Sequence, residues 1–118
     1  MSVVVDPARG EVWSVKFDPT VGQEMFKTRP AVVMNVPDVG IYDLCIVVPL
    51  TEWDSRYEDW IWMTPVPFTT ANGLSKDSAA DAFQVKSVSY LRFRAKLGIL
   101  TDEQVENIAA AIALCVGY

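Results

Sequence analysis

The pattern of hydrophobic and polar positions predicts a series of short strands. The clearest alternation lies in residues 10–17, where Trp13, Val15 and Phe17 are separated by polar residues. Such a period of two is typical of a half-buried strand. Apolar or aromatic runs predict further strands at residues 31–34, 44–48 (ended by Pro49), 60–64, 83–88 and 96–100, with a turn at residues 37–40 and a short turn or helical piece at residues 90–93.

The last segment carries the clearest helix signal. Thr101 and Gln104 have the spacing of a capping box, in which each side chain satisfies an amide at the start of a helix. Apolar residues then recur at helical spacing at Val105, Ile108, Ala109, Ile112 and Val116, before Gly117 as the predicted stop. The whole pattern predicts a mainly β fold, a small, closed and strongly bent sheet with a C-terminal helix packed on it. We interpret residues 1–118 as a single domain, because no repeat or linker is visible.

The composition is that of a globular chain, with 51% hydrophobic and 21% charged residues. No apolar run approaches the roughly 20 residues that cross a bilayer. The first residues lack the basic and long apolar regions of a signal peptide, so a cytoplasmic location is expected. Cys45 and Cys115 are therefore predicted to be reduced residues of the core.

Histidine is absent from all 118 residues. This absence excludes Ser-His-Asp triads, Cys-His pairs and histidine metal sites. The two cysteines are too far apart in the sequence to predict a structural zinc site. Any catalysis must use carboxylates, Arg, Lys, Tyr or hydroxyl groups, and no metal or other cofactor is predicted.

The charges are unevenly distributed. A formal net charge of −5 argues mildly against nucleic-acid binding. Residues 83–100, however, carry four cations and no acid, whereas residues 52–59 carry four acids and one cation. The basic stretch can form a local phosphate-binding face, and an ordinary solvated surface is an equally good interpretation of the same charges.

Four stretches of the chain, taken in order, resemble the PemK/MazF family of bacterial toxins. They lie at residues 9–20, 22–33, 47–51 and 83–101, and they include Arg-Gly-Glu-Val-Trp at 9–13, Thr-Arg-Pro-Ala-Val-Val at 28–33, Val-Val-Pro-Leu-Thr at 47–51 and Phe-Gln-Val-Lys-Ser-Val at 83–88. Residues 72–76 and 78–81 also look like a PemK-like subgroup. The set covers nearly the whole chain, which makes the resemblance specific.

The resemblance implies a small SH3-like barrel that forms a homodimer. It also implies metal-independent cleavage of single-stranded mRNA, leaving a 2′,3′-cyclic phosphate, and a cognate antitoxin that blocks the RNA groove. The family's key arginine falls on Arg29, its key threonine on Thr51 and its loop glutamate on Glu24.

These residue types suit attack of a ribose 2′-hydroxyl on phosphorus. Arg29 can stabilise the negative charge of the phosphorane, because its fork holds two phosphate oxygens and stays charged. The hydroxyl of Thr51 can donate to a phosphate oxygen or orient the nucleophile. Glu24 is a candidate base or an orienter of Arg29, and both roles stay open. Candidate RNA-binding residues are Gln84 for a base edge, Lys86, Lys27 and Ser87 for the backbone, and Trp53 for base stacking.

The sequence leaves two alternative functions open. One is a gyrase-poisoning binding toxin of the CcdB type, although the chain ends in Cys-Val-Gly-Tyr and lacks the terminal Trp-Gly-Ile of such toxins. The other is a catalytically weak family member that acts as an antitoxin partner or repressor.

Overall fold

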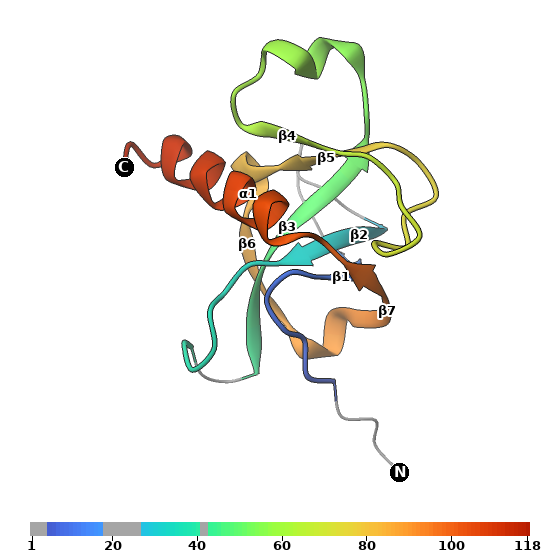
Figure 1. Ribbon diagram of the computed structural model, residues 1–118. Helices are drawn as coiled ribbons and strands as arrows, with labels where there is room; N and C mark the ends of the chain where they lie inside the picture. Colours follow the sequence, from blue (N-terminus) through green and yellow to red (C-terminus); the bar gives the residue numbers. More distant parts are fainter. Residues whose placement is uncertain (1–4, 18–26, 41–42) are drawn as a thin grey trace.

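A seven-stranded antiparallel sheet and one C-terminal helix form the fold in the computed structural model, which describes residues 5–17, 27–40 and 43–118 (Figure 1). The strands are β1 (Glu11–Lys16), β2 (Thr28–Val33), β3 (Leu44–Glu52), β4 (Met63–Val66), β5 (Ser78–Asp81), β6 (Lys86–Ser89) and β7 (Phe93–Ile99). The helices are the short 3-10 turns η1 (Ser55–Asp59), η2 (Ala82–Gln84) and η3 (Tyr90–Arg92) and the α-helix α1 (Asp102–Cys115).

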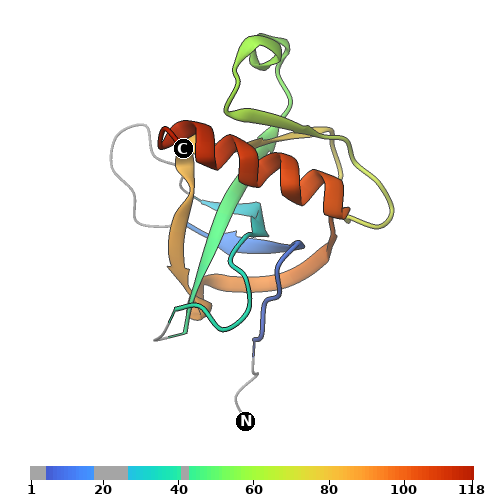
Figure 2. The ribbon, with the colours of Figure 1, turned by 60° about the vertical axis from the view of Figure 1, so that its left-hand side comes forward.

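The long strand β3 connects the two parts of the sheet. The strands follow the order β4-β5-β3-β2-β1-β7. Strand β6 pairs with the first half of β3, whereas β5 pairs with the end of β3. Figure 2 shows this sheet curled beneath α1. The expected mainly β class with a terminal helix is confirmed. Within the described residues the sheet bends strongly but stays open, because its pairings end at β4 and β7.

Apolar side chains cover both faces of the central strands. Val32 and Val48 pack with Ile108 of α1 in one cluster, whereas Val33 and Val47 belong to a second cluster on the other face. Successive residues of a strand point to opposite faces, so burial on both sides requires the unbroken apolar runs seen in the sequence. Both predicted runs are therefore true core strands.

Helix α1 begins as predicted. The Gln104 amide donates to Thr101 Oγ1 at 3.1 Å, and the Thr101 amide donates to Gln104 Oε1 at 3.0 Å. Val105 and Ile108 are buried, but Val116 lies beyond the helix as its C-cap and is 75% exposed. In the described part of the chain we find no helix with the length and apolar character of a membrane span.

The prediction of a strand at residues 83–88 is wrong for the first half of that segment. The Asp81 carboxylate accepts a hydrogen bond from the Phe83 amide at 3.2 Å and caps the turn η2. This local side-chain bond replaces extended backbone with a 3-10 turn. As a result Phe83 is 72% exposed, and β6 starts only at Lys86.

The strand predicted at residues 60–64 is also displaced. Asp54 accepts from the Arg56 amide at 3.0 Å and starts η1, which the sequence pattern did not predict. Trp60 then ends that turn, and β4 begins at Met63. Strand β5, a run of small residues, was likewise not predicted.

Pro49 does not end its strand, contrary to the prediction. Hydrogen-bonded and non-hydrogen-bonded pairs alternate along an antiparallel ladder. The Met34 amide donates to the Ile46 carbonyl, so Met34 and Ile46 form a hydrogen-bonded pair. Three positions further along the ladder, Ala31 and Pro49 therefore form a non-hydrogen-bonded pair. The missing N–H of Pro49 therefore faces away from β2, between the ends of β6 and β5. Strand β3 continues to Glu52, and this places Thr51 inside the sheet.

Candidate functional site

Arg29 and Thr51 line the same pocket. The β2–β3 register pairs Ala31 with Pro49, and continuing it by two residues brings Arg29 level with Thr51. The pocket has a volume of about 200 Å³. Its other lining residues are Pro30, Leu50, Glu52, Leu74, Ser75, Lys76 and Ser78. Two of the three predicted catalytic residues are thus brought together by strand pairing.

The guanidinium of Arg29 is incompletely paired. Its Nε atom is buried and has no hydrogen-bond partner among the described residues. A buried donor without an acceptor costs about 1–3 kcal/mol. Arg29 also lines the pocket, and a guanidinium there favours a ligand with negatively charged oxygens.

The pocket charges suit one phosphodiester. Lys76 Nζ lies 3.6 Å from Glu52 Oε2, and these side chains are 65% and 67% exposed. An ion pair this exposed contributes little to folding stability. Counted over the described lining residues, Arg29 and this pair carry one net positive charge, which matches the single negative charge of a phosphodiester.

Hydroxyl groups complete the polar lining. Ser78 Oγ is already committed, because it donates to the Lys76 carbonyl at 3.0 Å. Thr51 and Ser75 contribute the other two hydroxyls. Each can donate to a phosphate oxygen or accept from a ribose hydroxyl.

The loop that carries Ser75 and Lys76 is held rigidly. Buried Asn72 accepts from the Thr69 and Leu74 amides, both at 3.0 Å, and donates to the Pro67 carbonyl at 2.8 Å. The next residue, Gly73, has φ of +69°, and a Cβ there would lie 2.0 Å from the Leu97 carbonyl oxygen. Ser75 and Lys76 were not among the predicted site residues. The signal that pointed toward them was the resemblance of residues 72–76 to a PemK-like subgroup.

Lys86 shares the sheet face of the pocket. It pairs with Val47, which lies four residues before Thr51 on β3 and therefore points to the same face. The separation along the strand is about 13 Å. Lys86 Nζ lies 5.5 Å from the centre of the Phe17 ring, a cation–π contact. Ser87 points to the opposite face and lines a different pocket with Cys45 and Ile46, so the structure does not bring it to Arg29.

Gln84 lies at the junction of η2 and β6. Its Nε2 donates to Asp81 Oδ2 at 3.2 Å. Burial raises the pKa of Asp81, and hydrogen bonds from Gln84 and Phe83 partly oppose that rise. A buried carboxylate thus orients the Gln84 amide.

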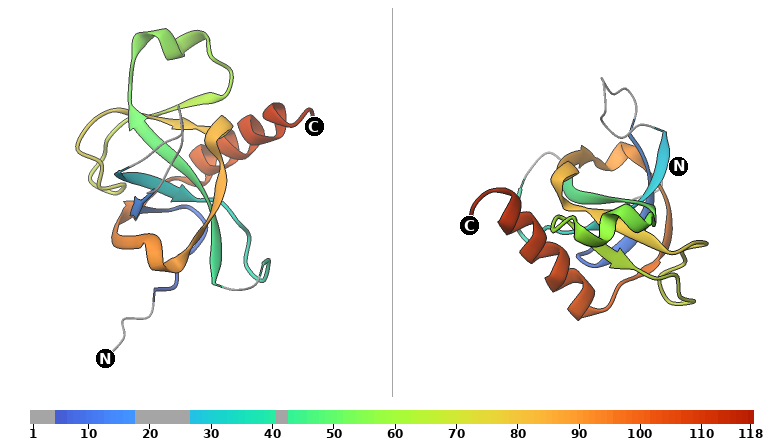
Figure 3. Two further views of the ribbon diagram at one scale, coloured as in Figure 1. Left: turned by 180° about the vertical axis from the view of Figure 1, so that it is seen from behind. Right: turned by 90° about the horizontal axis from the view of Figure 1, so that it is seen from above.

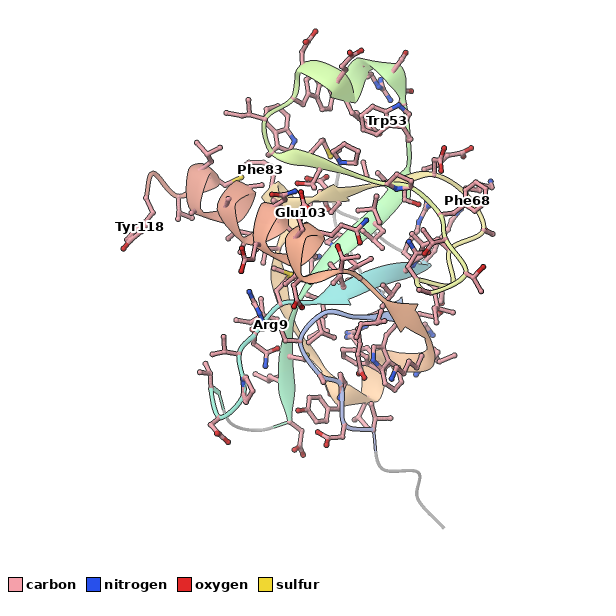
Figure 4. The ribbon with its side chains drawn as sticks, viewed as in Figure 1. Arg9, Trp53, Phe68, Phe83, Glu103 and Tyr118 are labelled. Carbon is pink, nitrogen blue, oxygen red and sulfur yellow. The ribbon has the colours of Figure 1, made fainter. Side chains whose placement is uncertain are left out.

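The remaining predicted residues differ in how far the structure describes them. Trp53 follows β3, and its amide donates to the Asp77 carbonyl at 2.9 Å; Figure 4 shows its ring near the top of the molecule. Lys27 directly precedes β2 with φ of +71°, and its carbonyl accepts from the Phe17 amide. Glu24 lies outside the described residues.

Neither cysteine is disulfide-bonded, as predicted, but the prediction that both lie in the core is wrong for Cys115, which is only half-buried at the end of α1. Cys45 is buried, and its thiol donates to Asn35 Oδ1 at 3.1 Å. Burial and, to a lesser degree, the charge of Glu11 raise the pKa of the Cys45 thiol to about 11. The thiol is therefore protonated at neutral pH and unsuited to nucleophilic chemistry.

Residues 8–116 match the sequence model of the PemK-like, MazF-like toxins of type II toxin–antitoxin systems. The chain belongs to this family. Arg29 and Thr51, the residues on which the resemblance is expected to place the family's arginine and threonine, are the two that line this pocket together.

Individual relatives are similar to this chain over nearly its full length. The chain is 32% identical over 117 residues to the endoribonuclease toxin MazF of Escherichia coli strain K12, covering 94% of this chain and 95% of that protein. The crystal structure of MazF from Deinococcus radiodurans superposes with a TM-score of 0.79 at 18% identity, covering 95% of this chain and 97% of that one. A mycobacterial endoribonuclease in complex with its cognate antitoxin gives a TM-score of 0.71 at 15% identity, covering 95% and 96% of the two chains.

Proposed function

We propose that this chain is an endoribonuclease toxin that cleaves single-stranded mRNA at the Arg29–Thr51 pocket. The observation that carries the proposal is the pocket that brings Arg29 and Lys76 together with the hydroxyl of Thr51. The full-length likeness to the endoribonuclease toxin MazF of Escherichia coli supports it.

Cleavage proceeds by transfer of the phosphoryl group within the RNA. The ribose 2′-oxygen forms a bond to the adjacent phosphorus, and the bond from phosphorus to the 5′-oxygen of the next nucleotide breaks. The products are a 2′,3′-cyclic phosphate and a 5′-hydroxyl. One proton must leave the 2′-hydroxyl, and one must reach the departing 5′-oxygen.

The pocket residues divide this work. Arg29 holds two non-bridging oxygens and stabilises their growing charge in the pentacoordinate state. Thr51 donates its hydroxyl to an oxygen of the phosphate or orients the 2′-hydroxyl. The ammonium group of Lys76 supplies a second positive charge and a proton donor on the same wall. Glu24 serves either as the base or as the orienter of Arg29.

The proposed partners follow from the family. A cognate antitoxin occludes the pocket, and the toxin acts as a homodimer in the cytoplasm, where mRNA is found. Lys86 and Gln84 extend RNA binding along β6 and η2, the first through a phosphate and the second through a base edge.

The test is cleavage of a defined single-stranded RNA by purified protein, with and without EDTA. We expect cuts that persist in EDTA, fragments with the mass of a 2′,3′-cyclic phosphate, and loss of cutting in Arg29→Ala. Full activity of Arg29→Ala, or 3′-phosphate fragments formed directly from water, would overturn the mechanism.

The same preparation distinguishes the alternatives. A block of gyrase supercoiling without RNA cuts would indicate a CcdB-type toxin. Absence of both effects, in protein that still binds an antitoxin, would indicate an inactive partner or repressor.

A further inference from the structure

Asp81 is a buried carboxylate on the sheet face of the Arg29–Thr51 pocket. It is 7% exposed and ends β5. The β3–β5 register pairs Thr51 with Ala79. Two residues further along β5, Asp81 is therefore level with Pro49. Side chains alternate along a strand, so Asp81 faces the same side as Thr51, about 7 Å further along the sheet.

The chain from β5 through η2 to β6 follows one edge of β3. Strand β5 pairs with the end of β3 and β6 with its first half, and Figure 3 shows β6 in orange beside β3 in green. Lys86 is level with Val47, four residues before Thr51 on β3. Asp81 is thus midway between the pocket and Lys86. An RNA strand that places its scissile phosphate in the pocket and an outer phosphate at Lys86 passes over this position.

Asp81 determines which way the side-chain amide of Gln84 points. Asp81 Oδ1 accepts from the Phe83 amide at 3.2 Å, and Asp81 Oδ2 accepts from Gln84 Nε2 at 3.2 Å. A carboxylate offers only acceptors, so it binds the NH2 group of the amide and not the oxygen. A half-turn of the amide would set Gln84 Oε1 against Asp81 Oδ2, and two buried acceptors would then lack a donor. The charge of Asp81 therefore directs Gln84 Oε1 away from itself.

An amide that presents its oxygen to RNA discriminates between bases. The exocyclic group of A and C is an amino donor, whereas the corresponding group of G and U is a carbonyl acceptor. The edges of unpaired bases in single-stranded RNA are open to such contacts. An oxygen held at this group accepts a hydrogen bond from A or C and repels G or U.

We propose that Asp81 is a specificity-determining residue, which directs Gln84 Oε1 toward the RNA so that the chain prefers A or C at one position beside the cut. Gln84 contacts the base, and Asp81 is a positioning residue that acts through it. This inference rests on the proposed endoribonuclease activity and adds to it a rule for choosing the cut site.

The substitution Asp81→Asn reverses the amide at almost constant side-chain size. The new side-chain oxygen still accepts from the Phe83 amide, and the new NH2 group takes the place of Oδ2. Because that group donates, Gln84 turns its oxygen toward it and its own NH2 group toward the RNA. The preference should change from A or C to G or U.

A second substitution should restore the original preference. Gln84→Glu, added to Asp81→Asn, places a carboxylate that accepts from the new NH2 group and again presents an acceptor to the RNA. We expect this double variant to prefer A or C, although neither original side chain remains. A purely structural role of Asp81 predicts slower cutting in both variants with no change of sequence.

The measurement is sequencing of the 5′ ends that each protein produces from a pool of randomised single-stranded RNA. At one position beside the cut, the wild type should favour A or C over G or U about five- to tenfold, the effect of one hydrogen bond. Asp81→Asn should invert this ratio at the same position, and Gln84→Ala should remove it. Gln84→Ala also tests the proposal by itself, should Asp81→Asn fail to fold in a thermal unfolding experiment.

Asp54→Asn is the matched control. Asp54 Oδ1 also accepts from a backbone amide two residues ahead, that of Arg56 at 3.0 Å, and it also caps a 3-10 turn. This variant loses the same charge at the same kind of cap and should keep the cut sequence of the wild type.

Three results would overturn this inference while leaving the proposed function intact. The first is wild-type cutting without a preference for A or C at any position beside the cut. The second is an unchanged cut sequence in Asp81→Asn, and the third is a preference that survives in Gln84→Ala. Absence of RNA cutting by the wild type would instead remove the proposed function and this inference together.

Discussion

Arg29 at the start of β2 and Thr51 near the end of β3 face one pocket, with the buried guanidinium Nε of Arg29 lacking a protein partner among the described residues. The β2–β3 ladder sets this relationship, because the register that pairs Val33 with Val47 brings the two polar residues level. The pairing of two core strands thus places two hydrogen-bond donors, the guanidinium of Arg29 and the hydroxyl of Thr51, at one end of the ladder. Substitutions can separate the roles of the two side chains.

Replacing Arg29 with alanine should reduce RNA cleavage about 100- to 1,000-fold, the usual effect of removing one preorganised donor. Lysine at this position should recover part of the rate, because it restores the charge without the two-pronged geometry. Single-turnover cleavage of a fluorogenic RNA measures both effects. Arg94→Ala is the control, since Arg94 is exposed and donates to the Leu91 carbonyl away from the pocket; equal losses in both variants would refute the assignment.

The two substitutions Thr51→Ser and Thr51→Val should separate the hydroxyl from the shape of the side chain. Serine keeps the donor and should retain most of the activity. Valine keeps the volume and should lose about tenfold or more, because a hydrogen bond to a charged group contributes about 1.5–3 kcal/mol. Cleavage rates at saturating RNA, with thermal unfolding as the check on folding, decide the matter. A valine variant as active as the wild type would exclude a role for the hydroxyl.

Removing the charge of Lys76 should weaken RNA binding, whereas removing the charge of Glu52 should strengthen it. Lys76→Met removes a cation and should raise KM, whereas Glu52→Gln removes an anion and should lower it. The slope of log KM against log salt should fall in Lys76→Met by somewhat less than one, as expected when a single cation no longer neutralises an RNA phosphate. The experiment is a salt series for the three proteins, and identical slopes would place the scissile phosphate elsewhere.

Asn72→Ala should destabilise the protein by about 3 kcal/mol, because the amides of Thr69 and Leu74 lose their buried acceptor. Urea unfolding followed by tryptophan fluorescence measures this. The nearby substitution Thr70→Ala, at an exposed loop position, should change stability by less than about 0.5 kcal/mol. Similar losses in both variants would mean that the loop is not organised by Asn72.

Glu11 should contribute stability that depends on pH. Although burial alone would raise its pKa, hydrogen bonds from Lys96, at 2.8 Å, and from Ala8 and Trp13 lower the pKa below the reference value of 4.5. A carboxylate with a lowered pKa in the folded state stabilises the fold fully above 4.5 and loses that contribution as the pH falls through the lowered value. Unfolding free energies of the wild type and Glu11→Gln should therefore differ at neutral pH and converge in acid. A constant difference across the range would contradict the prediction.

Local patterns predicted several elements well. The capping residues Thr101 and Gln104 and the apolar spacing after them predicted α1, because helix initiation depends on groups only three residues apart. The apolar runs at residues 31–34 and 44–48 predicted core strands for a similar reason, since burial on both faces leaves no polar position. The pattern failed where a single side chain redirected the backbone, as Asp54 does before η1 and Asp81 before η2.

The sequence by itself therefore determined the class of fold, the helix and the exclusion of histidine chemistry, and the resemblance predicted Arg29 and Thr51 as site residues. Only the tertiary structure decided what surrounds them. Ser75 and Lys76 reach the pocket because the bonds of Asn72 hold a distant loop beside β3, and Ser87 is turned away because it alternates with Lys86 along β6. The physical reason is that strand register and loop docking are set by contacts between residues far apart in the chain, which no local period of two or 3.6 residues encodes.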